Sequence, residues 1–272
     1  MREQKRIAVT GATGRVGRHL VDVLADQGHE VVEISRSRGV DVITAEGLAE
    51  ALDGVDAVID TATSPTPEGA MEFFTTAGRN LQAYGAHAGV QRLVVVSIIG
   101  ADRFPVGYNA AKVAQERIAL EGSIPAGVLR AAQFHEFVEQ LVDWGRQEDG
   151  SSQVPRMRTQ LVSARAVAES LAKMATEDSP FRPDQPLAEI AGPREESLVE
   201  MARLLAERRG DPERVEETRE ADESTRELYE SGALLPGPHA ELAGPTYEAW
   251  LDSAFAASPS TNRSSSSSKR AS

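Results

Sequence analysis

A glycine-rich turn near the start of the chain constrains the fold more than any other feature of the sequence. Residues 6–10 have the apolar pattern of a short buried strand, and residues 14–27 have the spacing of an amphipathic helix. In this stretch Gly11, Gly14 and Gly17 are spaced G-x-x-G-x-x-G. A strand, a glycine-rich turn and a helix in this order are the context that a dinucleotide-binding turn requires.

Each glycine has a physical role in such a turn. Gly11 permits the tight turn, Gly14 allows a pyrophosphate to approach the backbone, and Gly17 allows the helix to pack closely on the strand. The first N–H groups of the helix, together with its dipole, attract an anion. The sequence therefore predicts a dinucleotide site, although its spacing differs by one residue from G-x-G-x-x-G. The alternative is an ordinary strand–helix turn in which the glycines are incidental.

The first half of the chain alternates between strand-like and helix-like patterns. The predicted strands are 6–10, 30–35, 40–43, 55–60 and 93–97, and the predicted helices are 14–27, 46–52 and 68–87. Continuous apolar strands are typical of a sheet that is covered on both faces. Single helices between strands indicate right-handed crossovers and a parallel sheet. We therefore expect an α/β fold of the Rossmann type, with a doubly wound parallel sheet.

The second half has a more mixed pattern, which prolines interrupt between residues 180 and 193. The predicted helices are 109–120, 134–144, 164–175, 195–208 and 248–256, and the predicted strands are 127–130 and 159–162. We expect residues 1–256 to form a single NAD(P)-binding Rossmann domain, in which residues from about 131 to 256 build a small C-terminal substrate lobe. Residues 257–272 are rich in serine and cannot bury apolar surface, which predicts a disordered tail.

The composition excludes several classes of function. The formal net charge is −13 without a basic stretch, whereas a nucleic-acid-binding protein needs cationic side chains to neutralise phosphates. The chain has no cysteine, and its histidines lack metal-ligand spacing, so we expect neither a disulfide nor a metal site. The absence of a signal peptide and of a membrane-spanning apolar stretch indicates a cytoplasmic protein with no membrane partner. The oligomeric state stays open.

The end of the second predicted strand bears on the choice of dinucleotide. NAD sites usually place Asp or Glu there to bind the ribose hydroxyls, but this strand ends at Ser35, and Arg36 follows. Serine and arginine can donate hydrogen bonds to a 2′-phosphate, which a carboxylate would repel. We therefore expect NADP(H) to be preferred, with NAD(H) as the alternative. Glu33 is a competing ribose ligand, and Arg36 and Arg38 could instead be solvated loop charges.

Ser97, Tyr108 and Lys112 are candidate catalytic residues. Ser97 ends a predicted strand, and the spacing of four residues places Tyr108 and Lys112 on one face of the next helix. A lysine ammonium near a tyrosine favours the phenolate, and a serine can hydrogen-bond a substrate oxygen. The pattern predicts proton transfer by Tyr108. Tyr-x-x-x-Lys also occurs by chance, and Tyr108 could merely cap or pack the start of the helix.

Seven segments share their pattern with one known family. They are TGATGxxG at 10–17, GVDAVI at 54–59, AGVQRLV at 88–94, VSIIG at 96–100, YNAAK at 108–112, LRAAQF at 129–134 and TYEAWL at 246–251. With these segments the chain resembles the atypical short-chain dehydrogenase/reductases, specifically the NmrA-like NAD(P)-binding group, from about residue 5 to 255. The resemblance is specific for superfamily and cofactor class and weak for substrate.

The resemblance implies a set of binding residues. It implies backbone contacts to the pyrophosphate from Ala12, Thr13, Gly14, Arg15 and Val16. It implies 2′-phosphate contacts from Ser35 and Arg36, an adenine edge at Asp41 and Val42 where the third predicted strand ends, and an adenine ribose beside Ala62 and Thr63. It also implies the catalytic roles of Ser97, Tyr108 and Lys112. Two positions depart from the family: Phe74 replaces an asparagine of a proton relay, and alanine replaces an aspartate within residues 165–168.

Phe134 and His135 follow the strand at 127–130, where substrates usually enter an open α/β site, so we expect them to line the substrate pocket. A simple aromatic residue at a helix start is the alternative. Two functions follow from the whole sequence. The first is an NADP(H)-dependent oxidoreductase that transfers a hydride to or from a small carbonyl or quinone-like substrate, with Tyr108 as the acid/base. The second is an NADP(H)-sensing regulatory protein of the NmrA-like type, without turnover.

Overall fold

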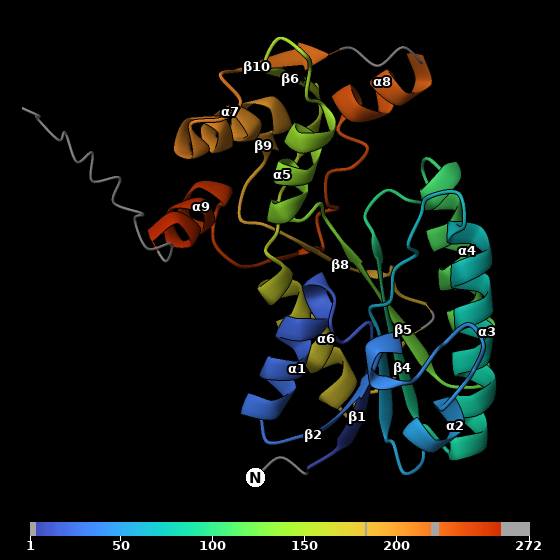
Figure 1. Ribbon diagram of the computed structural model, residues 1–272. Helices are drawn as coiled ribbons and strands as arrows, with labels where there is room; N and C mark the ends of the chain where they lie inside the picture. Colours follow the sequence, from blue (N-terminus) through green and yellow to red (C-terminus); the bar gives the residue numbers. More distant parts are fainter. Residues whose placement is uncertain (1–3, 183, 219–222, 257–272) are drawn as a thin grey trace, which may run out of the picture.

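The computed structural model describes residues 4–182, 184–218 and 223–256, and a seven-stranded parallel sheet lies at its centre (Figure 1). The strands lie in the order β11 (Glu241–Leu242), β8 (Ala188–Ala191), β5 (Ala126–Ala131), β4 (Arg92–Ile98), β3 (Ala57–Asp60), β1 (Arg6–Thr10) and β2 (Glu30–Ile34). The pairs between neighbouring strands are all parallel. The chain winds from β1 outward in both directions, which confirms the predicted doubly wound Rossmann fold.

Helices cover both faces of the sheet. One face carries α1 (Arg15–Asp26) and α6 (Ala164–Thr176), and the other carries α2 (Leu48–Ala51), α3 (Ala70–Ala88) and α4 (Gly107–Glu121). Successive residues of a strand point to opposite faces, and so Ile7 and Val9 enter the core beneath α1 while Ala8 enters the other core. Burial on both faces is the reason that the strands are continuously apolar.

A smaller lobe lies over the carboxyl ends of the strands (Figure 1). It contains α5 (His135–Trp144), β6 (Ser151–Pro155), β7 (Arg158–Thr159), β9 (Glu196–Ser197), α7 (Leu198–Arg209), β10 (Arg214–Thr218), α8 (Glu223–Ser231) and α9 (Tyr247–Ala256). Two strand pairs, β10–β6 and β7–β9, join its segments. Its core is separate and includes Val138, Leu161, Leu205 and Tyr247. The lobe is discontinuous in sequence, because α6, β8 and β11 return to the central layers.

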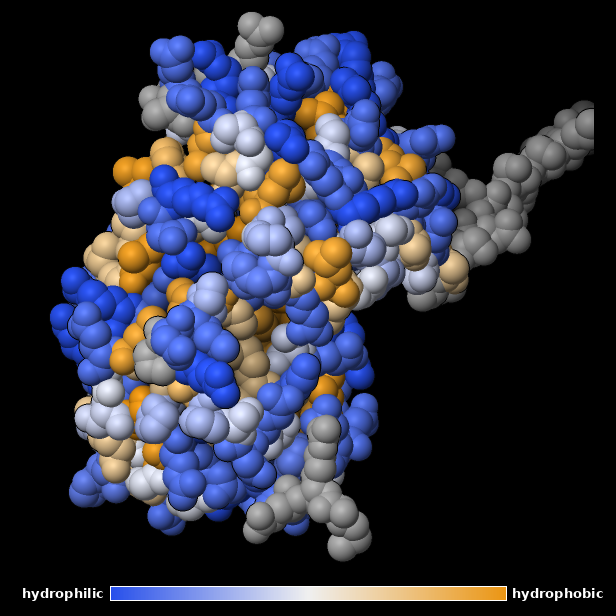
Figure 2. All heavy atoms as spheres, turned by 180° about the vertical axis from the view of Figure 1, so that it is seen from behind, coloured by the Kyte–Doolittle hydropathy of each residue, from blue (hydrophilic) through white to orange (hydrophobic). Residues whose placement is uncertain are grey.

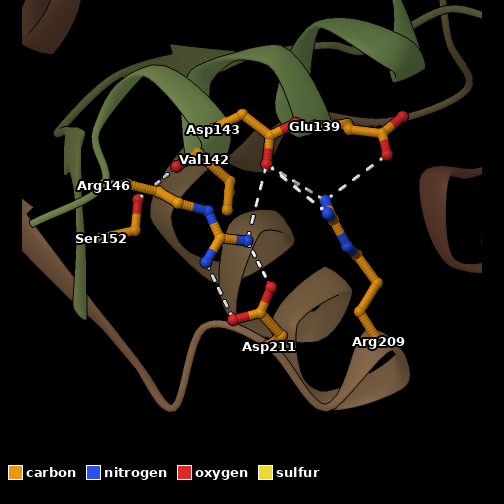
Figure 3. Close-up of polar contacts among 7 residues, drawn as sticks. All are labelled: Glu139, Val142, Asp143, Arg146, Ser152, Arg209 and Asp211. Carbon is orange, nitrogen blue, oxygen red and sulfur yellow. Dashed lines mark hydrogen bonds and ion pairs between the residues drawn. The ribbon is translucent and has the colours of Figure 1, made fainter. Parts of the chain in front are cut away.

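Ion pairs connect α5 to the end of α7 on the surface of this lobe (Figure 3). Arg146 donates to Asp211 at 2.8 Å and lies 3.7 Å from Asp143. Arg209, at the end of α7, lies 3.4 Å from Glu139 and 3.5 Å from Asp143. Exposed ion pairs contribute little to stability individually. Their geometry shows which segments meet, and the apolar core beneath them supplies most of the stabilisation.

Two predicted strands differ from the structure. The segment 40–43 is a turn, because Asp41 Oδ1 accepts hydrogen bonds from the backbone N–H groups of Ile43 at 2.7 Å and Thr44 at 3.4 Å. A short polar side chain that binds its own backbone in this way favours a turn. The predicted strand 159–162 is largely wrong as well, since only Arg158–Thr159 pairs with β9, and Val162 makes a single bridge to Phe134.

We did not predict β6, β8, β9, β10, β11 or α8 from the sequence, and the two residues of β9 fall within the predicted helix 195–208. The acidic run from 213 to 223 has exposed charges in its described residues, and part of it forms β10, in which Val215 is buried. The other predicted strands and helices are present with shifted ends. The single-domain boundary 1–256 stays a prediction, and the predicted tail 257–272 lies outside the described residues.

The rear surface of the molecule is largely hydrophilic, with apolar residues in separate small groups (Figure 2). Within residues 4–256, as far as the structure describes them, no helix combines the length and the apolarity that crossing a bilayer requires. The same residues contain no cluster of three His, Asp or Glu side chains arranged to hold a metal ion.

Candidate dinucleotide-binding site

The turns that follow β1, β2 and β3 meet at one edge of the sheet. Thr10 pairs with Ile34 and with Asp60, and Asp60 pairs with Val95 in β4. These four positions are therefore level with one another across the sheet. The segments after them lie at the sheet edge where ligands of open α/β sheets usually bind, on the side of the C-terminal lobe (Figure 1).

Two of the three glycines are fixed by the tight geometry of the turn. Gly11 has a φ of +64°, and a Cβ atom there would lie 2.8 Å from the Thr61 carbonyl oxygen. A Cβ atom on Gly17 would lie 2.1 Å from the Gly11 carbonyl oxygen. Gly11 therefore provides the left-handed turn against the end of β3, and Gly17 provides the close contact between α1 and that turn. Both observations agree with the predicted roles.

Gly14 forms the part of the turn that faces outward. It is the N-cap of α1, has a φ of −79°, and supplies no side chain to cap the helix. Thr13, Gly14 and Arg15 are exposed, whereas Ala12 and Val16 are buried. The helix start thus combines exposed backbone with the positive end of the dipole and no acidic residue in the first turn. These features fit a pyrophosphate, because a side chain at Gly14 would project into the space that it needs.

The end of β2 is arginine-rich and its nearby carboxylate is neutralised. Ser35 precedes a single 3₁₀ turn, η1 (Arg36–Arg38). Arg38 donates to both carboxylate oxygens of Glu33 at 3.1 Å. Arg36 is exposed, and its guanidinium makes no hydrogen bond or ion pair with any residue that the structure describes. Glu33 is therefore engaged within its own strand end, and Arg36 is available to an anion.

The predicted adenine edge lies in the turn that replaces the third strand. Val42 is buried in the core, and Asn80 of α3 donates to the Val42 carbonyl at 2.8 Å and to the Ile43 carbonyl at 3.0 Å. Asp41 uses its carboxylate to stabilise the same turn. Contact of Asp41 and Val42 with adenine stays a prediction, and any contact from Val42 would use its backbone.

Tyr108 lies in the first turn of α4 and reaches across to the turn after β3. Its hydroxyl is 2.8 Å from Thr63 Oγ1, and its ring packs edge-to-face on Phe74 of α3, with centroids 5.5 Å apart. Burial raises the pKa of the Tyr108 hydroxyl, the Thr63 hydrogen bond opposes that rise, and the Asp60 charge adds to it. The structure thus brings together Tyr108 and Thr63, which the sequence placed in different parts of the site.

Lys112 lies one helical turn further along α4 and is 4% exposed. Its ammonium donates to the Val96 carbonyl at 2.8 Å and to Gln115 Oε1 at 2.5 Å, and it lies 4.3 Å from the centre of the Phe74 ring. Burial lowers the pKa of Lys112 to about 8, against the opposing effects of Asp60 and Glu116. Phe74 therefore does more than replace an asparagine: its ring contacts both Lys112 and Tyr108.

The three candidate catalytic side chains share a region but not a hydrogen bond. Among the residues that the structure describes, Ser97 Oγ is buried and has no hydrogen-bond partner. Tyr108 bonds to Thr63, and Lys112 bonds to the carbonyl of Val96, the residue before Ser97. Phe74 joins Tyr108 and Lys112 through ring contacts only. Tyr108 and Lys112 therefore lie together on α4, and no hydrogen bond among the described residues joins Ser97 to either of them.

Phe134 and His135 have different surroundings at the start of α5. Phe134 is partly buried against the core beneath α1. His135 is fully buried in the lobe, where its ring contacts Tyr247 at a centroid distance of 5.5 Å and Trp250 at 5.1 Å. Its ring therefore does not line an open pocket in this structure, contrary to the expectation from sequence. His135 is the first residue of α5, and its side chain points into the core of the lobe.

Burial of His135 predicts an acid-sensitive lobe. Desolvation lowers the pKa of His135 to about 4, from an unfolded value of 6.5, with the Leu161 backbone opposing the shift. Because the unfolded chain binds the proton more tightly, stability falls as pH drops from about 6.5 towards 4. At about pH 5 the linkage amounts to about 2 kcal/mol. His135→Phe should abolish this part of the pH dependence in urea unfolding measured at about pH 8 and 5, whereas the exposed His87→Gln should retain it. If His135→Phe kept the same pH dependence of stability as His87→Gln, or if both variants lost it, the assignment to His135 would be contradicted.

Sequence reasoning missed the buried carboxylate that organises this region. Asp60, at the end of β3, accepts hydrogen bonds from Thr10 Oγ1 at 2.5 Å, the Ala62 backbone at 3.1 Å and Gln115 Nε2 at 2.7 Å. An aspartate inside a buried apolar strand was a usable signal, because buried carboxylates need partners. Gln115, three residues after Lys112, was a second signal, since that spacing places both on neighbouring turns of one helix face.

The fold and the glycine turn define a Rossmann-type dinucleotide-binding protein. A family model described as NAD(P)H-binding matches residues 11–178, which is more than half of the chain. The chain belongs to this NAD(P)H-binding family. The match covers the glycine turn, the candidate catalytic residues and α6, and it confirms the predicted resemblance to the NmrA-like NAD(P)-binding group of the short-chain dehydrogenase/reductases.

Curated relatives include dehydrogenases and an assembly factor. The 3 beta-hydroxysteroid dehydrogenase/Delta 5→4-isomerase of Mycobacterium tuberculosis is 31% identical over 170 residues, which cover 48% of this chain and 46% of that protein. Photosystem II assembly factor Ycf39 of Synechocystis is 30% identical, with coverage of 47% and 45%. L-arabinose 1-dehydrogenase (NAD(P)(+)) of Haloferax volcanii is 38% identical, with coverage of 34% and 40%. The chain thus spans less than half the length of these relatives.

Solved structures with the same fold bind dinucleotides of both kinds. MoeE5 in complex with UDP-glucose and NAD has a TM-score of 0.66 at 19% identity, with 92% of this chain and 97% of that chain covered. The NADPH-dependent quinone oxidoreductase QOR2 of Escherichia coli, complexed with NADPH, has a TM-score of 0.63 at 19% identity, with 92% and 99% covered. At such low identity the similarity establishes the fold alone.

Proposed function

We propose that the protein is an NADP(H)-dependent oxidoreductase that acts on a small carbonyl or quinone-like compound, with Tyr108 as the acid/base. The observation that carries the proposal is the position of the Tyr108 hydroxyl, 2.8 Å from Thr63 Oγ1 in the turn after β3. That position is on the same sheet edge as the glycine turn, so a group that moves a proton adjoins a site suited to a dinucleotide. Membership in an NAD(P)H-binding family supports the same function.

The residues would divide the work of binding. The backbone from Ala12 to Val16 would hold the pyrophosphate, and Ala62 and Thr63 would lie beside the adenine ribose. Ser35 and Arg36 would bind the 2′-phosphate that distinguishes NADP(H) from NAD(H). The proposal for NADP(H) is supported by the engagement of Glu33 by Arg38, because the guanidinium offsets the negative charge of that carboxylate near the 2′-phosphate position.

The reaction would need one proton at the substrate oxygen. The bound nicotinamide supplies the hydride that reduces a carbonyl carbon, or accepts it in the reverse direction. Tyr108 would donate its hydroxyl proton to the carbonyl oxygen, so that an alcohol results. Burial raises the pKa of this phenol and keeps it protonated at neutral pH, as a proton donor must be. The Lys112 ammonium, held on the far side of Phe74, would stabilise the phenolate that remains.

Arg36→Ala should remove the preference for NADPH. Hydrogen bonds to charged groups are worth roughly 1.5–3 kcal/mol, and each ~1.4 kcal/mol is a factor of ten in affinity. We therefore expect NADPH affinity to fall about ten- to hundredfold, measured by fluorescence titration, while NADH affinity stays within a few fold. Arg117→Ala removes the same charge from the exposed face of α4 and is the matched control. A wild-type protein that prefers NADH would contradict the assignment of Ser35 and Arg36.

A second candidate function is an NADP(H) sensor without turnover. It is favoured by the surroundings of Ser97 and Lys112. Ser97 Oγ is buried without a hydrogen-bond partner among the described residues, and the Lys112 ammonium already donates to two protein groups. A panel of quinones, aldehydes and ketones with NADPH distinguishes the two functions. Consumption of NADPH with any of them supports the oxidoreductase, and tight NADPH binding without consumption across the panel supports the sensor.

A further inference from the structure

We propose that Gln115 is a positioning residue that links the Lys112 ammonium to the Asp60 carboxylate and thereby holds Lys112 beside the Phe74–Tyr108 pair. Its assignment to catalysis rests on the function proposed above. The hydrogen-bond link itself does not depend on that function. Nothing in the sequence resemblance assigned a role to Gln115 or to Asp60.

Geometry shows why this position needs an amide. Gln115 is 1% exposed, and it accepts from Lys112 Nζ at 2.5 Å while it donates to Asp60 Oδ2 at 2.7 Å. An ammonium only donates hydrogen bonds and a carboxylate only accepts them, so the residue between them must do both. A primary amide does this with one rigid group, and the orientation of its oxygen towards Lys112 is fixed by the two partners.

The link continues to the glycine turn. Asp60 also accepts from Thr10 Oγ1 at 2.5 Å, and Thr10 directly precedes Gly11. At the other end, Lys112 lies over the ring of Phe74, on which the Tyr108 ring packs. One continuous buried path of contacts therefore runs from the phosphate end of the site to the proton-transferring end.

Few other charges face Lys112. Asp60 faces it from β3, and Glu116 faces it from its own helix, but Arg130 of β5 binds both oxygens of Glu116 at 3.0 and 2.8 Å. Tyr108 is the other titratable side chain on this face of α4. The amide of Gln115 is the group that connects the Lys112 ammonium to the Asp60 carboxylate by hydrogen bonds. Without the Gln115 amide, the buried Lys112 ammonium would lose a hydrogen-bond acceptor, and its pKa would fall further.

The test is a pH titration of Lys112 by NMR, using the 13Cε signal of the protein without added dinucleotide. The chain has four lysines, and Lys112→Arg assigns the signal. In wild type the pKa of Lys112, lowered by burial, is expected at about 8. Gln115→Met keeps the length of the side chain but removes both hydrogen bonds, and it should lower the midpoint by about one unit or more.

A matched control separates positioning from general loosening of the core. Gln82 is another buried glutamine, which donates to the Ala119 carbonyl at 2.9 Å and accepts from the Ile124 N–H at 3.0 Å. Gln82→Met should leave the Lys112 midpoint unchanged. An unchanged or raised midpoint in folded Gln115→Met, or an equal shift in Gln82→Met, would overturn the proposal. If Gln115→Met does not fold, the test uses Gln115→Asn, whose shorter amide cannot keep both hydrogen bonds. This variant should lower the Lys112 midpoint by less than the shift expected for Gln115→Met, and an unchanged midpoint would overturn the proposal.

Activity provides a separate arm of the test. If the oxidoreductase function holds, NADPH consumption should decline above about pH 8 as Lys112 loses its proton, and Gln115→Met should move that decline to lower pH in step with the titration. A shifted titration with no turnover in any variant would count against the proposed function and would leave the role of Gln115 in holding Lys112 supported. A shifted titration with an unshifted activity profile would remove Gln115 from catalysis.

Discussion

Tyr108→Phe should lower NADPH consumption at least ~100-fold with an accepted carbonyl or quinone, the usual scale for loss of a general acid. The substitution removes only the hydroxyl, so the ring of residue 108 should still pack edge-to-face on Phe74. The dinucleotide would be held by the glycine turn and the end of β2. NADPH affinity should therefore stay within a few fold of wild type, and the loss should appear in kcat.

Tyr84→Phe is the matched control, because Tyr84 is an exposed tyrosine of α3, which packs against α4. It should leave both affinity and turnover unchanged. A Tyr108→Phe protein as active as wild type would exclude Tyr108 from the mechanism, even if Lys112 and Ser97 proved important. The acid/base role also requires that Tyr108→Phe keep its NADPH affinity. If affinity and rate fell together, Tyr108 would have a role in binding instead.

Gly14→Val should weaken NADPH binding at least about 100-fold. A side chain at the N-cap of α1 would occupy the space through which a pyrophosphate reaches the exposed backbone of the turn. Loss of two hydrogen bonds to a charged group, at roughly 1.5–3 kcal/mol each, accounts for a change of this size. The φ of −79° permits a side chain, but the new Cβ would lie 3.0 Å from the Gly11 carbonyl oxygen, so the turn must shift by a few tenths of an ångström to accept it. We expect the protein to fold with this small adjustment, and thermal unfolding of Gly14→Val checks that it does.

Gly69→Val is a suitable control for this experiment. Gly69 is the N-cap of α3, has a φ of −84°, and a Cβ atom there would lie 3.4 Å from Thr66 Oγ1. It tests the cost of valine at a helix start outside the glycine turn. Equal NADPH affinity in wild type and folded Gly14→Val would contradict the phosphate-binding role of the turn. Gly17→Val is unsuitable as a binding test, because its Cβ atom, 2.1 Å from Gly11 O, would disturb the fold itself.

The sequence allowed prediction of the features that depend on neighbouring residues. Gly17 was interpretable because its Cβ atom would meet the Gly11 carbonyl oxygen within the same turn, and Gly11 because a tight left-handed turn disfavours a side chain. Only the structure shows that a Cβ atom on Gly11 would also meet Thr61 at the end of β3. The strands β1, β3, β4 and β5 and the helices between them were interpretable from continuous apolar runs and helical periodicity. The spacing of four residues between Tyr108 and Lys112 likewise predicted that both side chains lie on the same face of one helix.

The fold errors came from short segments whose structure is decided by distant partners. The strands β8 and β11 are four and two residues long, and they exist because β5 and then β8 offer unpaired backbone groups beside them. At 40–43 the apolar pattern favoured a strand. The Asp41 turn and the side-chain hydrogen bonds from Asn80, far along the chain, stabilise another conformation.

Within the candidate site, the sequence determined which chemical groups are present, and the tertiary structure decided their neighbours. Spacing along α4 could not reveal that Lys112 binds Gln115 and the Val96 carbonyl, because burial and strand register select those partners. Nor could it reveal that Tyr108 binds Thr63, since the turn after β3 meets α4 only in the folded sheet. A buried charge must find a partner, and only packing determines which one lies within reach.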